Sequence, residues 1–186
     1  MDWLNWRALY IAGICIFWIA FVLIKYKANP TVLEQWGIQK QNLKQSFLFL
    51  LPFTLICIAG IGTYGYFFKT FTLNWHIIPI FILYPLWGLI QQFMITGLIS
   101  GNLTAMNKHR LKNYQITLVT SFLFCLVHYP GGFLMLFTFI MQWVFITAFL
   151  RWKNIWTIGL YHGWIATLLL YYVMGRDLWI ELFASF

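Results

Sequence analysis

Long apolar runs separated by short polar segments make up almost the whole of this chain. Hydrophobic residues account for 62% of the sequence and charged residues for 9%, whereas soluble domains are about half apolar and a quarter charged. Six runs approach the roughly 20 residues that a helix needs to cross a bilayer. They cover about residues 7–24, 47–68, 76–100, 114–129, 132–150 and 155–174. The sequence therefore predicts an integral, multi-pass membrane protein with about six transmembrane helices.

Helices suit these runs because lipid offers no partners to unpaired backbone groups and barrel strands are shorter. No internal repeat or linker divides residues 1–186, so we expect a single membrane domain. The fourth run ends at His128-Tyr-Pro-Gly-Gly132, where Pro130 lacks a backbone N–H and the glycines free the backbone. Between the first two runs, Pro30 to Gln45 is expected to form an interfacial amphipathic segment broken at Gly37. The predicted fold is an all-α polytopic membrane helix bundle with a helix break after the fourth transmembrane helix.

Basic residues are concentrated in alternate loops, which is the pattern that sets membrane topology. The first, third and fifth loops hold Lys25, Lys27, Lys40, Lys44, Lys108, Arg110, Lys112, Arg151 and Lys153. We expect these loops to face the cytoplasm, with both termini outside, in the inner (plasma) membrane of a bacterium. The net charge of +8 then reflects topology and anionic lipid rather than nucleic-acid binding. His76 and His109, at or outside the interface, are expected to be solvated.

Four polar side chains lie inside the apolar runs, where burial costs roughly 2–7 kcal/mol when no partner compensates. At 1.5 Å per residue, Gln91 and Gln92 lie roughly 12–15 Å from the nearest predicted cytoplasmic loop. His162 lies roughly 10–12 Å and His128 roughly 15–20 Å from such a loop. These similar depths predict one polar pocket near the middle of the bilayer. The carboxylates all lie outside the runs, at Asp2, Glu34, Asp177 and Glu181.

Each of these polar side chains alone is more often a hydrogen-bond partner for a neighbouring helix than a functional group. Four of them, on three spans and beside a helix break, favour a functional site. A two-histidine haem or metal centre is the weakest interpretation. His128 directly precedes the break, and no set of carboxylates or thiolates accompanies the two histidines. We therefore expect no cofactor and no metal.

Three blocks of the sequence resemble the motifs of the CPBP family, which includes CAAX proteases and bacteriocin-processing (Abi-like) enzymes. Gln91-Gln92-Phe-Met-Ile-Thr96-Gly97 resembles the first motif, Glu-Glu-x-x-x-Arg, often followed by Gly. Phe124-Cys-Leu-Val-His128 matches the second motif, Phe-x-x-x-His, and His162-Gly-Trp-Ile-Ala166 matches the third, His-x-x-x-Asn, except at its last position. The blocks have the order and spacing of the family, and the resemblance covers about residues 30–172. It implies an intramembrane-protease fold.

The resemblance also implies a role for each motif position. In the family, the first glutamate and the second-motif histidine activate a water, the third-motif histidine and asparagine stabilise the oxyanion, and the second glutamate and the arginine brace the site. By position these roles fall on Gln91, His128, His162, Ala166, Gln92 and Thr96. Only the two histidines keep the family's residue type, and Thr96 and Ala166 are degenerate. Because a carboxamide does not titrate near neutral pH, Gln91 cannot accept a proton from water as a carboxylate does.

The additional changes at Thr96 and Ala166 indicate a natural charge-free variant of the site rather than an engineered Glu-to-Gln knockout. Two functions then remain. The first is a non-catalytic member of the fold that binds or scaffolds another membrane protein. The alternative is an active, CAAX-protease-like intramembrane endopeptidase that uses His128 and His162, with Gln91 orienting water. The expected partners are the lipid bilayer and another membrane protein, and no nucleic acid is expected.

Overall fold

The computed structural model describes residues 7–71, 74–106 and 111–183 of the chain. His109 and the charged residues Lys108 and Arg110 therefore lie outside the described part. The described residues contain helices and no strand, which confirms the all-α prediction. The chain divides into two compact units, residues 1–34 and residues 35–186.

The first unit contains α1, Arg7–Ala28, which corresponds to the first predicted span. The helix ends in a basic turn with Lys25 and Lys27. Asn29 then accepts hydrogen bonds from both the backbone N–H and the hydroxyl of Thr31, at 3.1 and 2.8 Å, which fixes the turn after the helix. The short helix α2, Val32–Gln35, begins directly after this turn.

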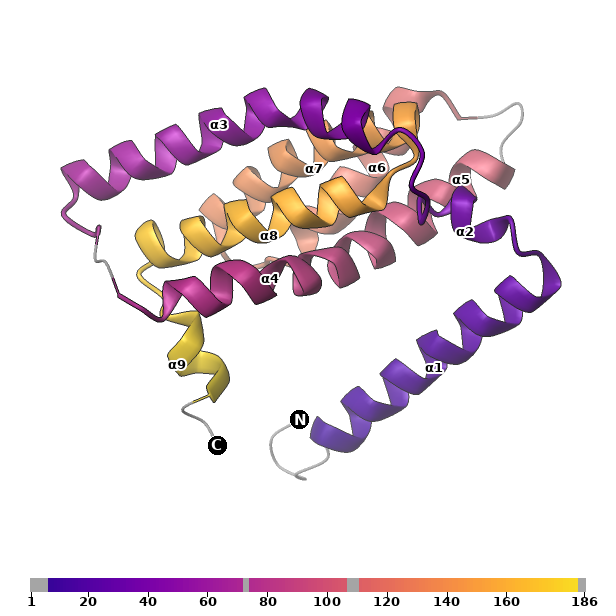
Figure 1. The fold of residues 1–186 in the computed structure, drawn as a ribbon, viewed down its shortest axis with the longest axis horizontal. Coiled ribbons are helices and arrows are strands. Elements are labelled where there is room, and N and C mark those ends of the chain that lie inside the picture. The colour runs from indigo at the N-terminus through magenta and orange to yellow at the C-terminus, as the bar shows by residue number, and fades with distance from the viewer. Residues whose placement is uncertain (1–6, 72–73, 107–110, 184–186) are drawn as a thin grey trace. The chain divides into compact units, whose positions relative to one another are not determined.

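The second unit is built from the remaining helices, and they follow all five later apolar runs. They are α3 (Leu43–Phe67), α4 (Ile77–Gln92), the π-helix η2 (Phe93–Ser100), α5 (Gly101–Met106), α6 (Asn113–Leu126), α7 (Gly132–Trp152), α8 (Ile155–Tyr172) and α9 (Leu178–Phe183). Figure 1 shows α8 lying between α3 and α4, with α6 and α7 behind it. This arrangement places the third-motif helix, α8, at the centre of the unit.

Three of the described helices are long and apolar enough to cross a membrane by themselves: Leu43–Phe67, Ile77–Met106 (α4, η2 and α5 in one continuous helix) and Gly132–Trp152. Helix α6 has 14 residues, so it is roughly 21 Å long and shorter than the hydrocarbon core. In α8, 13 of the 18 residues are buried, so protein rather than lipid surrounds most of this helix. The apolar helices place the protein in a membrane.

Helices α4 and α8 approach each other closely where both carry glycine. A Cβ atom added at Gly159 would lie 2.6 Å from the Cα of Leu89, and one at Gly88 would lie 2.7 Å from the carbonyl oxygen of Gly159. Gly163, one turn after Gly159, packs in the same way against the backbone of Pro85. Small residues four apart allow this backbone contact between helices in lipid, where the hydrophobic effect does not hold helices together. The contact brings His162 next to the end of α4.

The helix break predicted after the fourth span is present. Helix α6 ends at Leu126, and α7 begins at Gly132 after the turn that contains Pro130. Backbone bonds from His128 and Tyr129 to the carbonyls of Cys125 and Leu126 close the last turn. His128 therefore stands on a tight turn beside the unit's interior rather than within a helix.

The segment before α3 breaks at Gly37, as predicted, but it packs against protein more closely than an interfacial segment would. The side chain of Trp36 is only 1% exposed. Its Nε1 donates to Oδ1 of Asn102 at 3.1 Å, and the carbonyl oxygen of Gly37 accepts from Ile155 N at 2.9 Å. The predicted amphipathic pattern reflects the exposed polar residues on either side of this buried anchor.

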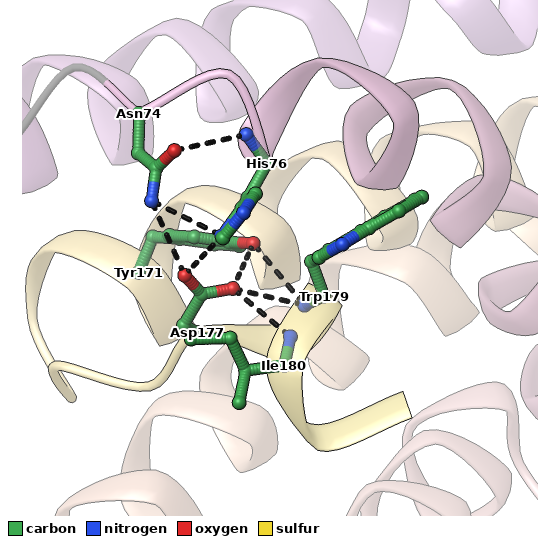
Figure 2. A network of polar contacts seen from close by, with 6 residues as sticks. All are labelled: Asn74, His76, Tyr171, Asp177, Trp179 and Ile180. Carbon is green, nitrogen blue, oxygen red and sulfur yellow. Dashed lines mark hydrogen bonds and ion pairs between the residues drawn. The ribbon is translucent and has the colours of Figure 1, made fainter. Parts of the chain in front are cut away.

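Asp177 anchors α9 to the beginning of α4, as Figure 2 shows. Its Oδ1 accepts from Tyr171 Oη at 2.9 Å and from Trp179 N at 3.0 Å, which caps α9, while its Oδ2 lies 2.7 Å from Nδ1 of His76. Burial acts to raise the pKa of Asp177, but the hydrogen bonds from His76 and Tyr171 outweigh this and lower it below the ordinary value of 3.8. The prediction that His76 is solvated was wrong: its side chain is only 18% exposed and is hydrogen-bonded to Asp177. Asp177 lies 101 residues away in sequence, so no local sequence pattern indicated this contact.

The contact between α4 and α8 generates a packing prediction. The variant Gly163→Ala places a methyl group on the backbone of Pro85, so α4 and α8 must separate. We expect the free energy of unfolding in mild detergent to fall by about 1–3 kcal/mol, measured by thermal denaturation. The matched control is Gly60→Ala in α3, because a Cβ at Gly60 meets no described atom within 4 Å. Equal losses in the two variants would show that the glycine contact does not hold α4 and α8 together.

Candidate functional site

A cavity of about 110 Å³ lies within the second unit, between α4, α7, α8 and the turn that follows α6. Its polar lining consists of Tyr84, Gln91, His128, Thr138, His162 and Arg176, and its apolar lining consists of Leu134, Phe137, Met141, Ala166, Leu169 and Leu170. The cavity is large enough for several waters, each of which needs about 10–15 Å³. Four of the positions singled out from the sequence, namely Gln91, His128, His162 and Ala166, thus come together around one cavity.

Gln92 occupies a different environment from its neighbour Gln91, because adjacent residues on a helix point about 100° apart. Its side chain is fully buried in a ring of hydrogen bonds with Thr96 and Gln142. Nε2 of Gln92 donates to Oε1 of Gln142 at 2.8 Å, and Nε2 of Gln142 donates to the Thr96 hydroxyl at 2.7 Å. The Thr96 hydroxyl donates in turn to Oε1 of Gln92 at 2.6 Å. The ring joins the end of α4 and η2 to α7 without using any charge.

His162 is tied to this ring by a fourth hydrogen bond. Nε2 of Gln92 lies 2.8 Å from Nδ1 of His162, whose side chain is 3% exposed. An amide NH₂ can only donate, so Nδ1 must accept and the proton of the neutral imidazole must reside on Nε2. The ring therefore fixes the tautomer of His162 and leaves its Nε2–H as a donor at the cavity.

His128 has the opposite tautomer. Its Nδ1 lies 2.9 Å from the carbonyl oxygen of Phe124, one turn earlier in the same polypeptide segment. A carbonyl can only accept, so Nδ1 carries the proton and the unprotonated Nε2 is the remaining acceptor. The Phe124 ring packs against both imidazoles, with centroid distances of 5.0 Å to His128 and 5.5 Å to His162. The cavity thus combines one imidazole acceptor with one imidazole donor.

Arg176 is the charged residue in the lining of this cavity. It follows α8 and pairs with Glu181 through two hydrogen bonds, from Nε to Oε1 at 2.9 Å and from Nη2 to Oε2 at 2.5 Å. The pair raises the pKa of Arg176 and lowers that of Glu181, so both groups stay charged. No carboxylate among the described residues lines the cavity itself, and no three His, Cys, Asp or Glu side chains of that part could hold a metal together.

Gln142 was missed in the sequence analysis, although it completes the ring. It is the amide within the apolar run of α7, flanked by Met141 and Trp143, and its side chain is fully buried. The signal that could have found it is the same as for Gln91, namely a polar side chain inside a predicted span. None of the three family motifs includes Gln142, so the motifs did not identify it.

One comparison with known proteins gave a match. The Type II CAAX prenyl endopeptidase Rce1-like family model matches residues 71–168, more than half of the chain. The chain belongs to this family. This confirms the resemblance to the CPBP family predicted from the motifs. No curated protein and no solved structure matches the chain.

All three motif blocks of this Rce1-like chain fall within the matched residues. The structure places Gln91, His128 and His162 at the cavity, and it places Gln92 and Thr96 in the ring behind His162. Ala166, one turn after His162, contributes only a methyl group to the lining. Gln91, Gln92 and Thr96, the three residues that the motif resemblance aligns with two glutamates and an arginine, are neutral, and Gln92 and Thr96 are hydrogen-bonded to each other.

The ring generates a stability prediction. In Gln142→Leu, one amide hydrogen of Gln92 loses its acceptor and the Thr96 hydroxyl loses a donor. We expect the free energy of unfolding in detergent to fall by about 1–3 kcal/mol, measured by thermal denaturation. The matched control is Ser121→Ala, because the buried hydroxyl of Ser121 has no hydrogen-bond partner among the described residues. Losing it should cost little or nothing, and a control as unstable as Gln142→Leu would contradict the role given to the ring.

Proposed function

We propose that this member of the Rce1-like family has lost glutamate-dependent peptidase chemistry and serves as a binding or scaffolding subunit for another membrane protein. The observation that carries the proposal is the neutral ring of Gln92, Thr96 and Gln142 with His162 attached to it. Every nitrogen and oxygen of the ring side chains has at least one hydrogen-bond partner, so the ring holds together without the acids or the arginine. Hydrogen-bond partners for buried polar groups are what a stable, uncharged ring in a membrane needs.

Chemistry supports the loss of peptidase activity. A neutral amide at Gln91 provides no general base, which typically costs a factor of about 10²–10⁴ in rate. A methyl group at Ala166 provides no oxyanion donor, which costs about 10²–10³ more. The described carboxylates Asp177 and Glu181 are engaged with His76 and Arg176, so neither is available to the site as a base.

The cavity is suited to a neutral hydrogen-bonding group of the partner. Nε2–H of His162 offers a donor and Nε2 of His128 offers an acceptor. The remaining lining is aliphatic and aromatic apart from Gln91, Thr138 and Arg176, and the charge of Arg176 is paired with Glu181. A peptide group has one carbonyl and one N–H, and in lipid both need partners. We infer that the partner presents a backbone peptide group here, from a membrane segment that is locally unwound.

A second candidate, an intramembrane endopeptidase, is favoured by one observation. Nε2 of His128 is unprotonated at a cavity that can hold water, so it could accept a proton from a water oriented by Gln91. The resulting imidazolium would have no carboxylate partner, because Nδ1 of His128 donates to the carbonyl of Phe124. This candidate therefore ranks below the binding function.

We also propose an orientation. Helices α3, α6 and α8 begin, and α7 ends, at one end of the second unit (Figure 1). Within three residues of these helix ends the sequence carries Lys40, Lys44, Lys112, Arg151 and Lys153. The excess of basic residues there supports a cytoplasmic position of this end. The location that we propose is the inner membrane of a bacterium, with both chain termini outside.

The two candidates predict different results for His128→Ala. If the chain is a binding subunit, the set of membrane-protein termini in cells, measured by terminal-peptide mass spectrometry, stays the same. The complex with the partner that co-purifies in mild detergent weakens, because the acceptor for its N–H is gone. Tyr129→Ala is the matched control, since Tyr129 lies on the same turn but is 76% exposed and does not line the cavity. It should change neither measurement.

Gln91→Glu extends the same test. Restoring one carboxylate leaves Thr96 and Ala166 unchanged, so neither the bracing arginine nor the oxyanion donor returns. We expect no new cleaved termini. Suppose that cleaved termini are present with the unmodified chain and with Tyr129→Ala but absent with His128→Ala. That result would contradict the binding function and would support the peptidase.

A further inference from the structure

The end of the second unit where α7 ends and α8 begins is rich in basic side chains. Five basic side chains lie there, and none of the carboxylates described in residues 35–183 does. Asp177 and Glu181, the two carboxylates of that range, lie at the other end, at α9 (Figure 1). An excess of basic side chains attracts an anionic partner.

A groove of about 440 Å³ opens at this end, between the first turns of α6 and the last turns of α7. Its lining includes Asn113, Tyr114, Thr117, Trp143, Thr147 and Arg151. Ligand sites in proteins typically measure roughly 300–1,000 Å³, so the groove can hold more than a single ion. Trp143 lies eight residues before Arg151 on α7, roughly 12 Å deeper along the helix.

Arg151 supplies the charge of the groove. Its guanidinium lies 4.9 Å from the ring of Trp152, and no carboxylate in the described part of the chain pairs with it. Lys153, two residues further, does not play this role: its buried Nζ lies 4.6 Å from the Phe149 ring, and burial lowers its pKa to about 8. Arg151 therefore remains an exposed, permanently charged group whose planar set of donors matches a phosphate.

We propose that this groove binds one anionic phospholipid, with the headgroup phosphate at Arg151 and Asn113 and an acyl chain along Trp143 and Thr117. The polar and charged groups lie at the helix ends, where a lipid headgroup would lie. The aromatic surface extends toward the membrane interior, where the acyl chain would lie. Leu118, one turn after Tyr114 on α6, is exposed and extends this apolar surface into the bilayer. Basic pockets between transmembrane helices suit anionic headgroups. The site is independent of the central cavity and of the proposed function.

The test uses the full chain purified in mild detergent, with phosphatidylglycerol as the probe and phosphatidylcholine as the neutral comparison. Bound lipid is counted by native mass spectrometry. Arg151→Gln should weaken phosphatidylglycerol binding about fivefold, as expected for one basic side chain at a headgroup. Thr147→Trp fills the groove without changing charge and should weaken it at least as much. Thr147 is exposed and its hydroxyl bonds only the carbonyl of Trp143 in its own helix, so this variant should fold.

Two matched controls separate the groove from general electrostatics and from added bulk. Lys44→Gln removes one charge on α3 outside the groove, and Ile82→Trp adds an exposed ring on α4, which does not line the groove. Each should leave phosphatidylglycerol binding within about twofold of the unmodified chain. The proposal is overturned if Lys44→Gln acts as strongly as Arg151→Gln, if Thr147→Trp has no effect, or if phosphatidylcholine binds equally well. Displacement of the lipid by millimolar inorganic phosphate would instead assign the groove to a soluble anion and overturn it too.

Discussion

The hydrogen bond from the Gln92 amide to Nδ1 of His162 determines how the site of this protein is arranged. It joins the end of α4 to the middle of α8, where the glycines of the two helices allow close backbone contact. The same amide holds Gln142 of α7, so three helices meet at one side chain. Because lipid provides no alternative partner, each member of this group depends on the others. The tautomer of His162 follows directly from this arrangement.

On the proposed function, the neutral ring also accounts for the joint change at Gln92 and Thr96, the positions that resemble a glutamate and an arginine of the family motif. In a membrane, an arginine without carboxylate partners would be a buried unpaired charge, and so would a carboxylate without its arginine. Either one would be costly. Gln92 and Thr96 form a short hydrogen bond instead, and Gln142 satisfies the groups that remain. On the proposed function, this exchange keeps the architecture of the cavity while removing its acid–base chemistry. The cavity is left with imidazoles of opposite tautomer, which suits binding of a neutral polar group.

Much of the fold could be predicted from the sequence because hydrophobic length and helix-breaking residues are local signals. The apolar runs are helical, and the break expected at Pro130 is present, although α6 already ends at Leu126 and α7 begins at Gly132. The motif spacing also singled out Gln91, His128 and His162, and these three residues line one cavity. What a single sequence could not show was pairing over long separations. The partners of Gln92 in α7 and of His76 beyond α8 lie 50 and 101 residues away. The close glycine contact of α4 with α8 depends on which helix faces which, and periodicity alone does not reveal this.

The most direct test of the account is the protonation of the two cavity histidines in the folded protein. Nitrogen-15 NMR of histidine-labelled protein in lipid at neutral pH distinguishes the two neutral tautomers and the imidazolium, and His128→Gln and His162→Gln assign the signals. The account predicts that His162 is protonated only at Nε2 and His128 only at Nδ1. An imidazolium at His162, or a proton on its Nδ1, would show that Gln92 does not donate to it and would contradict the neutral ring on which the proposed function rests.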